Sequence, residues 1–219
     1  MAMRINAANK TGFLALILCL AAALAMPPLA FSHSLEKFEQ KIHKREAYAQ
    51  IVQGKAPGFT LMDADGKKVE LSDFRGKVVV MNFLYTNCPD ICPLHSEKVA
   101  SIQESINQTP MKDMVQFITI TTDPAFDTPK ILKSYGGEHG LDPVNWIFLT
   151  SGVSKPAATR KLAERYGFKF TLGKEGYQMH GIVTMIIDKS GNLRAKYHSL
   201  KFNKTTMILH INAFTNDNH

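Results

Sequence analysis

Residues 77–95 join an apolar strand directly to two cysteines and then to a helix, and this junction constrains the fold more than any other stretch. Val78–Leu84 is a nearly continuous apolar run rich in β-branched residues, the pattern of a parallel strand covered on both faces. Pro93 follows the second cysteine and suits the first turn of a helix, where its missing N–H is not needed. The order strand, Cys88–Cys92 loop and helix therefore predicts a central strand that leads into a dithiol.

The two cysteines are separated by three residues, and the helix beside them influences their chemistry. His95, Val99, Ile102 and Ile106 recur at helical spacing and give this helix one face to bury. A helix start carries a partial positive charge and free N–H groups, which lower the pKa of a nearby thiol. The thioredoxin redox motif has two intervening residues instead. The pair can hold a metal ion or form a disulfide; a purely structural disulfide is disfavoured because so short a loop removes little chain entropy.

Four blocks of the sequence match, in order, a known family pattern over residues 56–190. They are residues 76–93 with Cys88-Pro-Asp-Ile-Cys92-Pro, residues 118–129 with Asp123 and Asp127, residues 146–152, and His180 with the strand that follows it. Together they resemble the Sco/SenC family, copper-binding proteins of thioredoxin-like fold that serve assembly of the copper A centre of cytochrome c oxidase. The resemblance implies a copper site made from Cys88, Cys92 and His180.

The N-terminal residues have the layout of an export signal. An apolar run from Gly12 to Ala25 follows two basic residues, has no acidic residue before it, and ends in Ala23-Leu24-Ala25, a possible cleavage site. The run is shorter than the about 20 residues of a membrane span, but extension to Phe31 nearly reaches that length. We therefore predict a signal peptide or membrane anchor at residues 1–25, a linker at residues 26–54, and export of the protein.

The rest of the chain is predicted to form one domain, residues 55–216. Phe59–Met62 and Val69–Leu71 flank the turn-rich Asp63-Ala64-Asp65-Gly66, which indicates a β-hairpin before the dithiol strand. Strands and helices then alternate before a closing hairpin and a final helix. The expected strands are 115–121, 146–149, 182–187 and 193–197, and the expected helices begin near Thr128, Ser154 and Asn203. This order predicts an α/β, thioredoxin-like fold with an added N-terminal β-hairpin.

The ligands implied by the resemblance suit copper. Two thiolates are soft ligands that prefer Cu(I) or zinc, and an added imidazole gives a three-coordinate set acceptable to both Cu(I) and Cu(II). Structural zinc sites and iron–sulfur clusters ordinarily need four protein ligands. His180 is expected in a loop just before a strand, and His95, three residues after Cys92, is the alternative imidazole, which we expect to pack on its helix face. Asp123 and Asp127 are possible supporting residues or ordinary turn and capping groups.

The charge balance excludes few partners. The formal net charge is +7, from 26 Lys and Arg against 19 Asp and Glu, which fits simple solubility, an anionic membrane surface or an acidic partner. The basic residues are scattered and no nucleic-acid motif is present, which argues against nucleic acid as a partner.

Two classes of function are considered. The first, implied by the resemblance, is a copper metallochaperone, which is not an enzyme and which serves the copper-site subunit of cytochrome c oxidase; the N-terminal segment predicts that it acts in the periplasm, either soluble or anchored to the inner membrane. The second is a thiol-disulfide reductase acting on the cysteines of that copper site or of another exported protein. A peroxiredoxin-type peroxidase is disfavoured because the usual proline–threonine pattern is missing around Cys88. Copper loading would require a periplasmic thiol reductant, since a disulfide cannot hold the metal.

Overall fold

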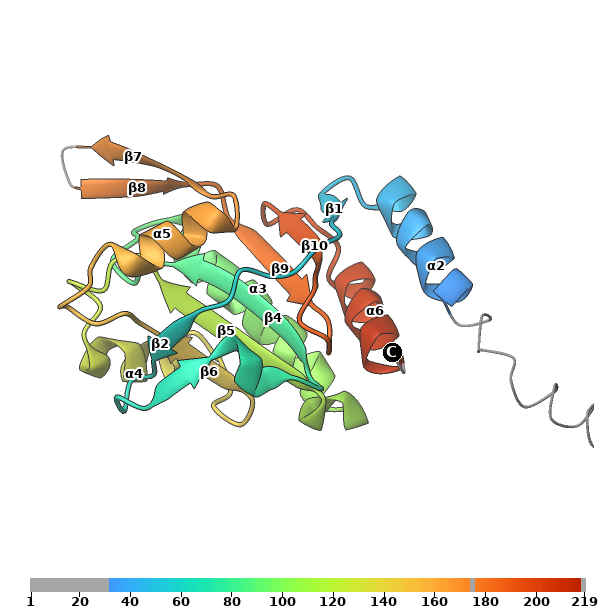
Figure 1. Cartoon of the computed structure of the whole chain (residues 1–219), viewed down its shortest axis with the longest axis horizontal. Helices are drawn as coiled ribbons and strands as arrows, with labels where there is room; N and C mark the ends of the chain where they lie inside the picture. Colours follow the sequence, from blue (N-terminus) through green and yellow to red (C-terminus); the bar gives the residue numbers. More distant parts are fainter. Residues whose placement is uncertain (1–31, 174–175, 218–219) are drawn as a thin grey trace, which may run out of the picture. The chain divides into compact units, whose positions relative to one another are not determined.

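A six-stranded sheet forms the centre of the protein (Figure 1). The computed structural model describes residues 32–173 and 176–217, and every structural statement below concerns these residues. The chain divides into two compact units, Met1–Glu36 and Lys37–His219, and the sheet lies in the second. The predicted signal or anchor at residues 1–25 falls outside the described part, and no described helix is long and apolar enough to span a membrane.

The predicted central strand is confirmed. The strand order is β1-β10-β9-β4-β5-β6, in which β4, β5 and β6 are parallel and the pairs β4–β9, β9–β10 and β10–β1 are antiparallel. All residues of β4 and β5 are buried, as expected for strands covered on both faces. The bounds are β1 Ala49–Ile51, β4 Val78–Leu84, β5 Val115–Thr121, β6 Trp146–Leu149, β9 Val183–Ile187 and β10 Leu193–His198.

Two short hairpins lie outside this sheet. The predicted N-terminal hairpin consists of β2 (Thr60–Met62) and β3 (Lys68–Glu70), and the carboxylate of Asp63 accepts the N–H groups of Asp65 and Lys67 in its turn. The second hairpin pairs β7 (Lys169–Gly173) with β8 (Gly176–His180) and was not predicted. The prediction that His180 lies in a loop is therefore wrong, because the backbone of His180 forms the last residue of strand β8.

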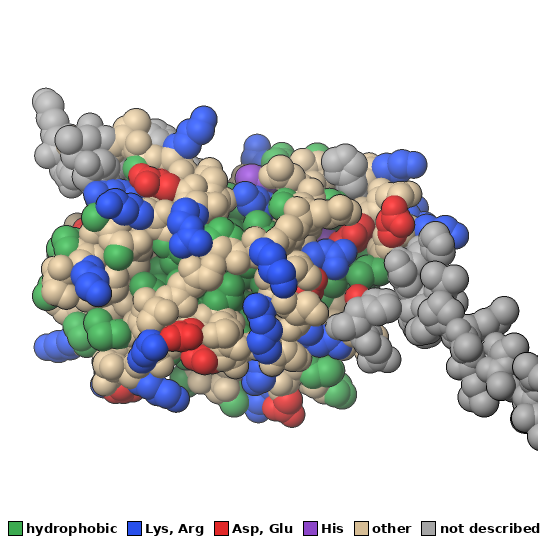
Figure 2. All heavy atoms as spheres, viewed as in Figure 1, with side chains coloured by type: hydrophobic (Ala, Val, Ile, Leu, Met, Phe, Trp, Pro, Cys, Tyr) green, Lys and Arg blue, Asp and Glu red, His purple; other side chains and the backbone are tan. Residues whose placement is uncertain are grey.

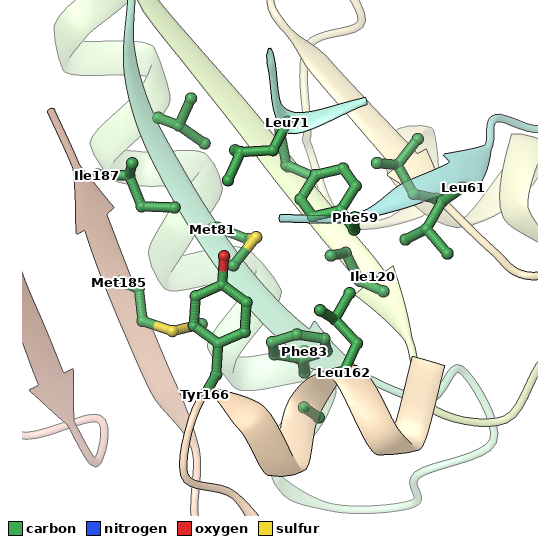
Figure 3. Close-up of a cluster of buried hydrophobic side chains, with 14 of the residues drawn as sticks. Phe59, Leu61, Leu71, Met81, Phe83, Ile120, Leu162, Tyr166, Met185 and Ile187 are labelled. Atoms are coloured by element: carbon green, nitrogen blue, oxygen red, sulfur yellow. The ribbon is translucent and has the colours of Figure 1, made fainter. Parts of the chain in front are cut away.

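Helices and the N-terminal hairpin cover the two faces of the sheet. On one face, α5 (Ala158–Arg165), the β2–β3 hairpin and the 3-10 helix η1 (Leu71–Phe74) enclose Met81 and Phe83 in the cluster of Figure 3. On the other face, α3 (Ile91–Asn107) packs against the sheet and against α6 (Lys204–Thr215). Helix α4 (Pro129–Glu138) is joined to α3 by a 2.9 Å hydrogen bond between the hydroxyls of Ser96 and Tyr135, and the 3-10 helix η2 (Pro110–Asp113) follows α3. Because successive side chains of β4 point to opposite faces of the sheet, this strand contributes to the packing on both faces.

One helix begins later than the sequence suggests. Helix α5 starts at Ala158, whereas helical periodicity extends back to Ser154. The preceding residues form a turn, in which the N–H of Lys155 donates to the carbonyl of Gly152 and the hydroxyl of Ser151 donates to the carbonyl of Lys155. These local hydrogen bonds compete with those of a helix.

The segment described above as a linker contains two elements, helix α2 (Ser32–Arg45) and β1. Within the second unit, Ile42 is buried, and the carboxylate of Glu39 lies 2.9 Å from the guanidinium of Arg194 on β10. Glu46 accepts a hydrogen bond from the N–H of Asn203, which caps α6. Residues 37–51 therefore pack on the same unit as the rest of the fold.

The surface charge is widely distributed. Figure 2 shows the Lys and Arg side chains of the described residues spread over the visible face, with hydrophobic side chains between them. This distribution suits a solvated surface, in agreement with the scattered basic residues of the sequence.

Candidate metal centre

The two cysteines lie together at the carboxyl end of β4. Cys88 is in the turn after this strand, where its N–H donates to the carbonyl of Tyr85 at 3.3 Å, and Cys92 is the second residue of α3. Both thiols are free, and their residues are 7% and 1% exposed. The helix begins at Ile91, two residues before Pro93, so Cys92 lies inside the first turn.

The thiols differ in their ionisation. Burial opposes the ionisation of Cys88, but hydrogen bonds from the backbone of Asp90 and Cys92 and from the side chains of Cys92 and Tyr85 hold its pKa below the ordinary value. Burial, together with the adjacent Cys88, raises the pKa of Cys92 far above the ordinary value. The expectation of a lowered pKa is therefore correct for Cys88 and wrong for Cys92, because its burial outweighs the effect of the helix start.

A cleft of about 430 Å³ opens onto both cysteines. Met179 and Gly181, the neighbours of His180 in sequence, line this cleft with them. The His180 side chain lies outside the described part of the structure, while its backbone pairs with Lys169 at the end of β8. Among the side chains that are described, no three His, Cys, Asp or Glu residues are grouped to hold a metal ion. A site that combines the dithiol with His180 remains a prediction.

His95 packs against the sheet, as expected. Its residue is fully buried, and its Nε2 lies 2.7 Å from the hydroxyl oxygen of Thr184 on β9. Burial, with a smaller contribution from Lys98, lowers the pKa of His95 to about 4. His95 is not among the residues that line the cleft, so the structure does not bring it to the dithiol pocket.

The two aspartates have different surroundings. Asp127 is 1% exposed and accepts hydrogen bonds from the hydroxyls of Thr86 and Thr121 and from the N–H of Thr86 at 3.3 Å. Burial raises the pKa of Asp127 despite these hydrogen bonds. Asp123 is partly buried and its carboxylate accepts the N–H of Phe126 at 3.4 Å, which is turn chemistry. Asp127 therefore supports the loop that carries Cys88, whereas Asp123 shapes the loop after β5.

Sequence analysis did not single out two ring side chains among the residues that line the cleft, those of Tyr85 and His198. The hydroxyl of Tyr85 is hydrogen-bonded to Cys88, and burial together with this thiol raises the pKa of Tyr85 to about 12. The position of Tyr85, directly after the central strand, was a usable signal. His198 ends β10 and pairs with Val183, so strand register alone brings it to the cleft and no motif spacing identifies it.

Comparison with known proteins adds independent information. The family model described as SCO1/SenC matches residues 49–216. The SCO1 protein homolog of Bacillus subtilis is 35% identical over 92 residues, which cover 42% of this chain and 47% of that protein. The chain spans about half the length of the curated relatives it matches.

Solved structures show the same fold. BsSco, reported with a disulfide switch and as a member of the Sco family of cytochrome c oxidase assembly proteins, matches with a TM-score of 0.66 and 25% identity, covering 77% of this chain and 98% of that one. Bradyrhizobium japonicum ScoI with copper bound matches with a TM-score of 0.60 and 26% identity, covering 74% and 99%. The thioredoxin-like α/β fold expected from the sequence is confirmed.

Proposed function

The chain belongs to the SCO1/SenC family, and we propose that it is a copper metallochaperone that binds one copper ion through Cys88, Cys92 and His180. Relatives in this family are cytochrome c oxidase assembly proteins, and several of their structures contain copper. By extension, the cargo is delivered to the copper-site subunit of that oxidase.

The observation that carries this proposal is the presence of two free thiols in one cleft. They supply soft ligands side by side, and residues adjoining His180 line the same cleft. Thiolates suit Cu(I), and an imidazole allows Cu(II) to be held as well. Three protein ligands leave the metal open to a ligand from a partner, as delivery requires.

The unequal thiols suggest an order of ligation. Cys88, whose pKa is lowered, would supply the first thiolate. Cys92 would release its proton to solvent as the positively charged metal ion binds its sulfur and the second bond forms. The hydrogen bond from Tyr85 orients the Cys88 sulfur while the metal is exchanged. Copper binding should therefore release protons, and it should weaken in acid.

A thiol-disulfide reductase is the second candidate, and the same asymmetry favours it. A thiol of lowered pKa beside a buried partner thiol suits nucleophilic attack followed by resolution of a mixed disulfide. The substrate would be the cysteines of the oxidase copper site or those of another exported protein.

Metal analysis of protein purified from exporting cells separates the two functions. A metallochaperone should carry about one copper per reduced chain, and His180→Ala should bind Cu(II) more weakly than the parent protein does. Rapid disulfide turnover by a parent protein that takes up no copper would establish the reductase instead.

We also propose the cellular arrangement that this function requires. Residues 1–25 would act as a signal peptide or inner-membrane anchor, residues 26–36 as a connecting segment, and the unit that begins at Lys37 and contains residues 55–216 as the copper-handling part in the periplasm. A periplasmic thiol reductant would keep Cys88 and Cys92 ready for loading, because the disulfide lacks thiolate ligands.

A further inference from the structure

His198 is a second imidazole at the dithiol cleft, and it is held in a defined place. It is the last residue of β10, where it pairs with Val183 of β9. Val183 lies three residues after His180 in the sequence. The N–H of His198 donates to the carbonyl of Tyr48 at 2.8 Å, and the next N–H, of Ser199, donates to Ile182 at 3.1 Å. Both flanking backbone segments therefore fix its position.

The ring of His198 is prepared to accept a metal ion. Its Nε2 lies 3.2 Å from the side-chain oxygen of Gln50 on β1. An amide oxygen only accepts hydrogen bonds, so Nε2 carries the proton and Nδ1 keeps its lone pair. Metal-binding histidines commonly donate their second ring N–H to an oxygen in this way. Desolvation by neighbouring atoms, and then the charge of Lys196, lower the pKa of His198, which favours the neutral ring.

Exposure distinguishes His198 from the thiols of the same cleft. His198 is exposed, whereas Cys88 and Cys92 are buried. This imidazole is therefore more accessible to an ion from solvent than the two sulfurs are. His198 does not group with both cysteines as a three-ligand site among the described side chains, so it is not assigned to the resting set.

We infer that His198 is a capture ligand, which binds incoming copper at the mouth of the cleft and passes it to the thiolates of Cys88 and Cys92. This inference rests on the proposed copper-handling function. The transfer is a ligand exchange: the bond from Nδ1 to copper breaks as bonds to sulfur form, the thiol protons pass to solvent, and the oxidation state of copper is unchanged. A single imidazole binds more weakly than two thiolates, so the ion moves inward.

The test measures loading kinetics and equilibrium binding separately. The reduced full chain is mixed anaerobically with Cu(I) as its coloured bicinchoninate complex, and loss of colour gives the rate of transfer. His198→Gln should load at least about tenfold more slowly than the parent, because an amide is a poor copper ligand, while its final stoichiometry and affinity stay unchanged. Since the ring is neutral, this substitution leaves the net charge of the cleft mouth as it is.

Two further variants sharpen the result. Gln50→Leu removes the acceptor that fixes the tautomer and should give a smaller slowing in the same direction. His139→Gln is the matched control, because His139 borders a separate cleft together with Asp142 and should load at the parent rate.

The outcomes are distinguishable. Loading of His198→Gln at the parent rate would refute the capture role and leave the proposed function intact. Loss of equilibrium affinity comparable to that in Cys88→Ser would also refute it, by making His198 a resident ligand. Failure of the parent to take up any Cu(I) would overturn the proposed function itself.

Discussion

The carboxylate of Asp127 accepts hydrogen bonds from both the N–H and the hydroxyl of Thr86, a residue 41 positions earlier in the chain. Thr86 lies two residues before Cys88, so the loop after β5 holds the dithiol turn in place. Asp127→Ala would leave buried donors without a partner and should reduce the free energy of unfolding by about 2–4 kcal/mol. Urea denaturation measures this loss. Asp123→Ala is the control, and an equal loss in both variants would contradict the supporting role of Asp127.

Acid should destabilise the protein through His95. Its pKa is about 4 in the folded state against an ordinary 6.5. The unfolded chain therefore binds a proton between these values while the folded chain does not, so stability is lost as pH falls from about 6.5 towards 4. The contribution is roughly 3 kcal/mol. Urea denaturation from pH 7.5 to pH 4 should show a shallower pH dependence for His95→Gln than for the parent; identical slopes would exclude this origin.

Copper binding should respond differently to each proposed ligand. Cys88→Ser and Cys92→Ser should abolish tight binding, whereas His180→Ala should chiefly weaken Cu(II), because two thiolates still hold Cu(I). Competition with chelators measures each oxidation state. If His95→Ala lost Cu(II) binding and His180→Ala kept it, the imidazole ligand would be His95, and the proposed site would be wrong.

The disulfide and the copper complex should be mutually exclusive states. Oxidation of Cys88 and Cys92 consumes both thiolates, so the oxidised chain should bind no copper tightly, and bound copper should protect the thiols from oxidation. Equilibrium dialysis of oxidised and reduced protein, with thiol counting before and after, tests both statements. Equal binding by the two forms would refute them.

Removal of Arg194 should be destabilising, because it would take the paired cation from the buried carboxylate of Glu39 and one of several donors from the partly buried Asp188. Its guanidinium lies 2.9 Å from Glu39 and 3.3 Å from Asp188. Arg194→Met should lower the free energy of unfolding by about 2–4 kcal/mol. The matched control is Lys68→Met, which breaks the exposed pair with Glu70 and should change stability little. Similar melting temperatures for both variants would contradict the importance of this contact.

The sequence predicts the centre of this fold better than its periphery. The strand before Cys88 has a strong apolar signal, and turn residues mark the β2–β3 hairpin, so both could be identified from local pattern. A helix within residues 34–54 is one of two interpretations of the local pattern, but the β7–β8 hairpin and the packing of residues 37–45 on the sheet could not be predicted in this way. Their positions depend on long-range contacts, such as that of Glu39 with Arg194, which leave no periodicity in the sequence.

The candidate site divides in the same way. The dithiol is visible as a motif, whereas the environment of each thiol is not: the raised pKa of Cys92 results from its burial in the folded protein. His198 reaches the cleft only through the register of β10 with β9, which a single sequence does not reveal.

The β7–β8 hairpin has a consequence for how firmly a metal can be held. It forms a two-stranded sheet of its own, and Phe170 and Met179 pack against the core cluster. Two-stranded ribbons are only marginally stable by themselves. A copper ion bound by both the dithiol and His180 would then connect the central sheet to this hairpin, so metal binding would stabilise the hairpin against local opening. Release could begin with local opening there, while the central sheet stays folded.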